Sequence, residues 1–228
     1  MKRFISLLVM TIFVLTSFAQ KDVTTFLGIP VDGFRADMRK ALIAKGFTPQ
    51  QVAGEEYFEG EFNGADVNVY IGTNNNKVYR IMVCDQHRLN EANIKIRFNN
   101  LVYQFEKNQR YSSLDDYTIP EGEDIGYEMN VHNKNYDALF IQNPDMQKFD
   151  TLAFSQQIEQ EIRQKYTPEQ LENPSEDLQA EIKSLMLSRS MDLLSNKRVW
   201  FRIVESYGEY YIAMYYDNEY NKANGEDL

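Results

Sequence analysis

The segment FNGADVNVYIGTNNNKVYRIMV, residues 62–83, decides the fold because it places two turn signals between strand-like runs. Asn63-Gly64 is the strongest short-range signal for a β-hairpin, and Asn74, Asn75 and Asn76 mark a second turn. Together with the preceding residues 56–61, EYFEGE, the segment predicts three consecutive antiparallel strands.

The two turns also predict the register of these strands. A two-residue turn at Asn63-Gly64 pairs Phe58 with Val69, and a three-residue turn at the asparagines pairs Val69 with Ile81. One face of the sheet is then apolar throughout, and a slip of one residue would mix polar side chains into it. The opposite face is predicted to carry three cross-strand rows, namely Tyr57-Tyr70-Arg80, Glu59-Asn68-Met82 and Glu61-Asp66-Cys84.

Helical periodicity appears on both sides of this segment. Residues 31–47 form an amphipathic pattern, with Asp32 as a candidate N-cap and Gly46 at the position of a left-handed C-cap. Apolar residues recur at helical spacing in 90–111, and two further helices are expected in 154–166 and from Ser175 to Leu193.

Two more hairpins are expected in the second half of the chain. Strands are predicted at 125–132 and 136–142, around Asn133-Lys134-Asn135, and at 199–206 and 210–217, around Tyr207-Gly208. Residues 112–124 are polar and acidic and contain Pro120 and Gly122, so this segment is expected to be a loop.

The order of these elements predicts an α+β fold. Strands and helices come in runs rather than in strict alternation, which favours mainly antiparallel sheet with helices packed on one face. Residues 20–228 are expected to form a single α+β domain. Two similar small lobes, divided near 112–124, are the alternative.

The chain begins with a pattern typical of a cleavable signal peptide. MKRFISLLVMTIFVLTSFA, residues 1–19, has a basic start, a short apolar run and small residues before the expected cleavage point. The apolar run is shorter than the ~20 residues of a membrane span, so no span is expected in the mature chain. No cysteine follows the run to accept a lipid, and we expect a periplasmic or secreted protein.

The charge of the mature chain argues against several partners. The net charge of −10 becomes −12 without Lys2 and Arg3, so nucleic acid and anionic lipid would be repelled. Because the chain has one cysteine, an intramolecular disulfide is excluded and the expected domain must be held by its apolar core.

A weak candidate for a metal site surrounds the single cysteine. Residues 84–87 read CDQH, and the predicted register brings Cys84 and His87 close to the carboxylates of Glu61 and Asp66. A structural zinc site is usually built from four Cys and His ligands, and the second pair is missing here. Neighbouring carboxylates also make a thiol less nucleophilic, so neither a metal, a cofactor nor an enzymatic function is expected.

Two surfaces are candidate binding sites. The first is the outer face of the first sheet, with Tyr57, Tyr70, Arg80 and Met82, where Arg80 could stack on Tyr70 and offer its guanidinium to an acidic group. The second is the tyrosine-rich last hairpin. Alternation places Tyr211 and Tyr215 on one face and Tyr210 and Tyr216 on the other, and the latter pair with Trp200 is the candidate platform for a sugar ring.

Several segments resemble a family of uncharacterised exported proteins from Gram-negative gut anaerobes. These segments are FLGIPVDG at 26–33, FNGADVNVYIGTNNNKVYRIMV at 62–83, IKIRFNNLVYQFE at 94–106 and the ending YYIAMYYDNEYNKANGEDL. The resemblance implies export and a shared α+β fold but no activity. The element order is also similar to that of the β-lactamase-inhibitor-like fold, whose members grip partners with an open sheet face.

The expected function is therefore that of a non-catalytic exported binding protein, with an envelope protein as partner. The alternative is a carbohydrate-binding accessory protein of the cell envelope, which would bind a glycan through its tyrosine-rich hairpin.

Overall fold

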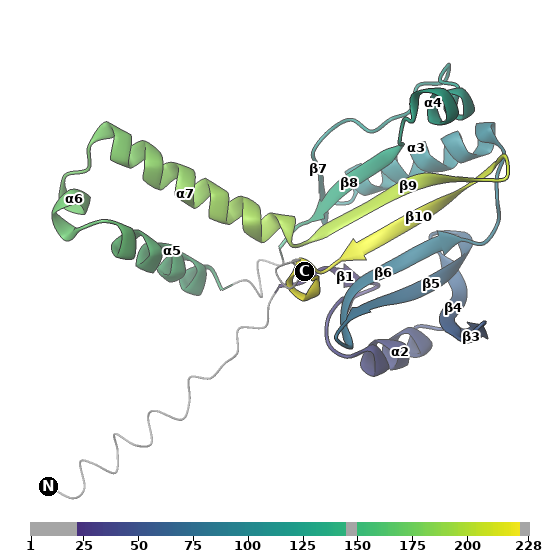
Figure 1. Ribbon diagram of the computed structural model, residues 1–228, viewed down its shortest axis with the longest axis horizontal. Helices are drawn as coiled ribbons and strands as arrows, with labels where there is room; N and C mark the ends of the chain where they lie inside the picture. Colours follow the sequence, from purple (N-terminus) through teal and green to yellow (C-terminus); the bar gives the residue numbers. More distant parts are fainter. Residues whose placement is uncertain (1–21, 145–149, 224–228) are drawn as a thin grey trace, which may run out of the picture.

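A computed structural model describes residues 22–144 and 150–223 (Figure 1). One half of its sheet contains the predicted three-stranded unit, formed by β4 (Glu55–Phe62), β5 (Ala65–Asn74) and β6 (Lys77–Asp85). Asn63 and Gly64 form the turn between β4 and β5 with φ of 53° and 72°, and Phe58 pairs with Val69 as predicted. The left-handed backbone of this turn explains the choice of Asn and Gly.

The register between β5 and β6 differs from the prediction by two residues. The turn contains only Asn75 and Asn76, both with positive φ, and a bulge lies just before it, at Gly72/Thr73 on β5. Val69 therefore pairs with Val83 rather than with Ile81, and Tyr70 lies beside Met82 rather than beside Arg80. An even shift keeps each side chain on its predicted face but changes its cross-strand neighbours.

Eight strands form one antiparallel sheet, in the order β3-β4-β5-β6-β10-β9-β8-β7. The strands not yet given are β3 (Thr48–Val52), β7 (Tyr111–Ser113), β8 (Asp137–Gln142), β9 (Arg198–Ser206) and β10 (Glu209–Asp217). A separate small hairpin joins β1 (Thr25–Phe26) to β2 (Ile29–Pro30). The structure thus confirms the α+β class with mainly antiparallel sheet. That residues 20–228 fold as one cooperative unit stays a prediction.

The hydrophobic core lies on one face of the sheet, under α3 (Glu91–Lys107) and α2 (Arg35–Ala44). Asn90 caps α3 by accepting a hydrogen bond from the Asn93 amide, and the apolar side of α3 packs on β9 and β10. Gly46 ends the α2 region with φ of 96°, as expected. Asp32, in contrast, does not cap α2, because the N-cap residue is Phe34.

Residues 125–132 form a helix, α4 (Ile125–His132), where the sequence pattern predicted a strand. The Asp124 carboxylate accepts a hydrogen bond from the Tyr127 amide, and Asn133 ends the helix in a left-handed conformation. Ile125 is buried and Met129 packs against the core, a spacing of four residues that suits a helix. The alternation of apolar residues was therefore misleading here.

The helices of residues 151–195 form an excursion between two paired strands. α5 (Thr151–Lys165), α6 (Pro168–Glu172) and α7 (Glu176–Ser195) follow β8 and precede β9, yet β8 and β9 pair directly, from Asp137–Arg202 to Ile141–Arg198. Figure 1 shows α5 and α7 lying side by side and projecting from the end of the sheet. Ile158 is the only buried hydrophobic side chain that the described residues of these three helices contribute. A short 3-10 helix, η1 (Glu219–Asn221), follows β10.

Candidate functional site

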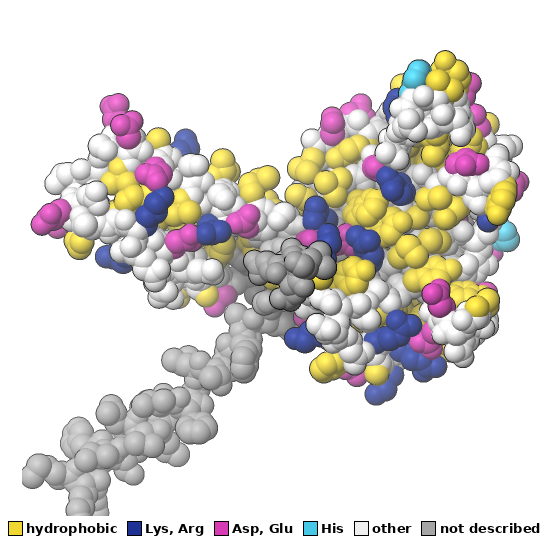
Figure 2. Space-filling model, in the orientation of Figure 1, with side chains coloured by type: hydrophobic (Ala, Val, Ile, Leu, Met, Phe, Trp, Pro, Cys, Tyr) yellow, Lys and Arg dark blue, Asp and Glu magenta, His cyan; other side chains and the backbone are white. Residues whose placement is uncertain are grey.

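The face of the sheet opposite α2 and α3 carries a continuous row of apolar side chains. Strand pairing aligns Tyr57 with Tyr70, Tyr70 with Met82, Met82 with Tyr215, Tyr215 with Trp200, and Trp200 with Leu139. We call these six residues the aromatic row. Each is half-buried, and strand spacing of ~4.8 Å makes the row roughly 24 Å wide. Figure 2 shows hydrophobic side chains gathered over β6, β9 and β10 on this open face.

The rings of the row pack against one another in two pairs. The centroids of Tyr215 and Trp200 are 4.0 Å apart with planes at 14°, and those of Tyr57 and Tyr70 are 5.7 Å apart with planes at 28°. Such contacts stabilise side-chain orientations that single exposed rings would not hold. The row is therefore a preformed surface.

A buried carboxylate fixes the Trp200 end of the row. Asp217 accepts two hydrogen bonds from the Arg80 guanidinium, at 2.6 and 2.8 Å, and one from the Trp200 indole at 3.0 Å. The Arg80 guanidinium carbon also lies 4.9 Å from the centroid of Tyr215. Arg80 is thus bound within the molecule and does not stack on Tyr70 or offer its guanidinium to a partner, which corrects the prediction.

Three tyrosines of the open face have a pKa raised above the usual value, namely Tyr70, Tyr211 and Tyr215. Burial raises the pKa of each, and for Tyr70 repulsion from the ionised form of the neighbouring Cys84 adds to the effect of burial. Burial, with Asp85 nearby, also raises the pKa of the Cys84 thiol to about 11. At neutral pH the Cys84 thiol beside the row is therefore protonated, and a protonated thiol is a poor nucleophile.

Tyr210 and Tyr216 do not belong to the exposed surface. Their relative exposures are 6% and 3%, and both lie in the core under the helices. The predicted alternation of the last hairpin is correct, but the outer set is Tyr211 and Tyr215. The proposed platform of Tyr210 and Tyr216 is therefore wrong, because these rings fill the interior while Trp200 stacks on Tyr215.

The weak metal candidates are only partly brought together. Glu61 pairs with Asp66, and His87 Nε2 lies 3.3 Å from an Asp66 carboxylate oxygen, but Cys84 pairs with Asn68 and Ala213. The two-residue register shift moves Cys84 away from Asp66. Within residues 22–144 and 150–223, no group of three or more Asp, Glu, His or Cys side chains is arranged to hold a metal ion.

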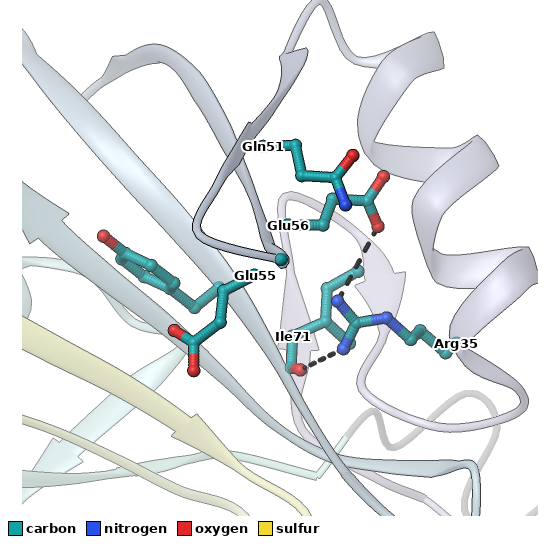
Figure 3. Close-up of a pocket in the computed structure, with 7 residues that line it drawn as sticks. Arg35, Gln51, Glu55, Glu56 and Ile71 are labelled. Carbon is teal, nitrogen blue, oxygen red and sulfur yellow. Dashed lines mark hydrogen bonds and ion pairs between the residues drawn. The ribbon is translucent and has the colours of Figure 1, made fainter.

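A polar hollow of about 640 Å³ lies beside the Tyr70 end of the row, around the β3–β4 turn. Its lining includes Arg35, Gln51, Glu55, Glu56 and Tyr70. Figure 3 shows the Glu55 side chain directed away from Arg35, Gln51 and Glu56. Arg35 donates to the Ile71 carbonyl at 3.0 Å and pairs with Glu56, so it is not poised to bind an anionic substrate.

The sequence contains a signal for the Trp200–Tyr215 pair of the row. A two-residue turn at Tyr207-Gly208 places Trp200 opposite Tyr215, and the apolar side chains of Val199, Phe201 and Ile203 require Trp200 to face outward. Leu139 had no such local signal, because its place depends on the pairing of β8 with β9 across the helical excursion.

Comparison of the chain with protein-family models, with curated proteins and with solved structures gave no match. Among the described residues, no helix is both long enough and apolar enough to cross a membrane.

Proposed function

We propose that this protein is a non-catalytic binding protein that grips a partner protein with the open face of its sheet. The observation that supports this proposal is the aromatic row itself. It is continuous, apolar and half-buried, and its four rings pack in two pairs. Contiguous apolar surface of this kind marks interaction sites, whose centres are enriched in Tyr, Trp and Met.

The orientation of the rings favours a protein partner over a glycan. A sugar stacks on the free face of an aromatic ring, whereas Trp200 and Tyr215 cover one face of each other at a centroid distance of 4.0 Å. The Arg80 and Arg202 guanidinium carbons also lie 5.7 Å from the Trp200 ring. Rings of neighbouring strands that stack at this distance have their planes roughly perpendicular to the sheet, so they present their edges to solvent. The spaces between ring edges can accommodate side chains of a protein partner.

The proposed place of action is outside the cytoplasm. The signal-like pattern of residues 1–19 supports export to the periplasm or secretion, and the resemblance to exported proteins of gut anaerobes agrees with it. Residues 1–19 lie outside the described residues, so this part of the proposal rests on sequence alone. N-terminal sequencing of the protein recovered from the envelope fraction tests it, and an intact Met1 would contradict it.

Cross-linking in cells followed by pull-down tests the binding role. Tyr70→Ala removes one ring of the row without touching the Arg80–Asp217 pair, and we expect it to weaken capture of a dominant partner protein by about 10-fold to 30-fold. Tyr103→Ala is the matched control, since Tyr103 is exposed on α3 at the other side of the sheet. Equal loss in both variants, or recovery of glycan alone, would refute the proposal.

A further inference from the structure

Beside the aromatic row, one end of the open face is acidic, and no Lys or Arg among the described residues pairs with its carboxylates. Glu55, Glu59 and Glu61 alternate along the open side of β4, and Asp66 pairs with Glu61 from β5. We call these four residues the acidic band. Tyr57 lies between Glu55 and Glu59 on the same strand, so the carboxylates flank the Tyr57–Tyr70 pair directly.

The charges of the band are not neutralised within the described part of the molecule. Side chains of β3 and β5 on this face are Thr48, Gln50, Val52, Asn68 and Tyr70, so the neighbouring strands supply no Lys or Arg. Glu59 accepts a hydrogen bond from the Gln50 amide at 2.8 Å, and Asp66 meets only the His87 imidazole at 3.3 Å. Like charges opposite each other, as at Glu61 and Asp66, cost stability unless a cation relieves them.

The other end of the same face is arranged differently. Arg80 pairs with Asp217, Arg202 with Asp137 at 2.8 Å, and Arg198 with Glu219 at 2.5 Å. Each arginine there has its own carboxylate. The open face is therefore polarised, with neutralised charges around Trp200 and unpaired carboxylates around Tyr57 and Tyr70.

We infer that the partner of the aromatic row presents a basic and apolar protein segment, with Lys or Arg side chains flanking an apolar residue that contacts Tyr57 and Tyr70. This inference rests on the proposed function and adds the chemistry of the partner. Lys and Arg would meet the acidic band, and the central apolar side chain would meet the two rings. A second copy of the chain is disfavoured as the partner, because each mature copy has a net charge of −12, the −10 of the full chain without Lys2 and Arg3, and would bring the same carboxylates.

Trp200 provides the readout for a direct test, because it is the only tryptophan and lies in the row. Residues 20–228 are titrated with two synthetic peptides that share alternating Leu and Phe residues and carry Lys or Glu between them. We expect the Lys peptide to shift Trp200 emission and to bind at least about tenfold more tightly than the Glu peptide, with an affinity that falls as salt is added.

Two matched double variants test whether the carboxylates of the acidic band bind the Lys peptide. Glu55→Gln with Glu59→Gln should weaken the Lys peptide about threefold to tenfold. Glu176→Gln with Asp177→Asn removes the same charge from the exposed start of α7 and should leave its affinity unchanged. Equal weakening by both pairs would show a general charge effect and overturn the inference.

The remaining outcomes separate this inference from the proposed function. If both peptides bind equally and Tyr70→Ala weakens both, the row binds partners but the basic chemistry is wrong. If neither peptide binds, the basic segment is refuted while cross-linking with Tyr70→Ala still decides the proposed function. A shift of Trp200 emission with protein concentration alone would identify a second copy as the occupant and also overturn the inference.

Discussion

At the level of single side chains, Asp217 links three strands of the open face. Its buried carboxylate accepts hydrogen bonds from Arg80 and Trp200 and so connects β10 to β6 and β9. Arg80→Ala would leave this carboxylate without two of its donors, and removing one partner of a buried charged pair is costly.

We therefore expect Arg80→Ala to lower the free energy of unfolding by about 2–3 kcal/mol. This loss is smaller than that for a fully buried ion pair, because the Arg80 side chain is partly exposed. Tyr70→Ala, on the same face, should cost only about 1 kcal/mol. Urea unfolding of both variants measures the difference. Equal stability of the two would show that the Arg80–Asp217 pair contributes little.

Cys84 gives a prediction of pH dependence. Burial favours the neutral thiol and raises its pKa to about 11, against 9.0 for an exposed cysteine. Only the thiolate reacts, so alkylation of the folded protein by iodoacetamide should stay slow at pH 8–9 and rise as the pH approaches 11. The urea-unfolded chain should react quickly from pH 9 upward. Rapid alkylation of the folded protein at pH 8 would contradict the burial of this thiol.

The individual side chains also show what local sequence can predict. Strand alternation correctly separates Tyr211 and Tyr215 from Tyr210 and Tyr216, because neighbouring side chains on a strand point to opposite faces. It does not say which face is covered, and α3 decides that by packing on β10. The Arg80–Asp217 pair joins residues 137 positions apart, so only tertiary structure reveals it.

Among the strands and helices, the register of a hairpin could be predicted only as well as its turn signal specified the turn length. Asn63-Gly64 specified its hairpin fully, whereas three successive asparagines allowed turns of two or three residues. The two-residue turn and the one-residue bulge at Gly72/Thr73 each shifted the register of β5 and β6 by one position, so the outer side chains beyond the bulge have neighbours two positions from those predicted. The sequence of β3 gives no strand signal, because it is polar and contains Pro49. Proline is nevertheless tolerated here, since β3 is an edge strand of the sheet.

The α5–α7 excursion should be dispensable for the sheet. β8 and β9 already pair as adjacent antiparallel strands. Just before β9, the Lys197 ammonium donates hydrogen bonds to the Asp22 carboxylate and to the Asn143 carbonyl, which follows β8. Replacing residues 145–195 by a short Gly-Asn linker should therefore preserve cooperative unfolding and the near-ultraviolet circular dichroism of Trp200, since a short loop can join paired strands. Loss of cooperative unfolding in this variant would show that the helices hold the sheet together.

For the molecule as a whole, the α+β class could be predicted from the runs of strands and helices, but the strand order could not. β10, at the end of the described chain, lies between β6 and β9 and so joins the two halves of the sheet. Contacts this distant in sequence leave no local pattern. The aromatic row takes one side chain from each of six strands drawn from both halves, and it becomes visible only when those strands are assembled.

The most direct measurement of the proposed role is site-specific photo-cross-linking in the native envelope. A photoreactive phenylalanine replaces Met82 in the centre of the aromatic row, or Tyr103 on the opposite side of the molecule. The proposal predicts one dominant protein adduct from position 82 that is absent from position 103 and is lost when Tyr70→Ala is added. Adducts of equal yield from both positions, or from position 103 alone, would show that the open face is not the binding surface.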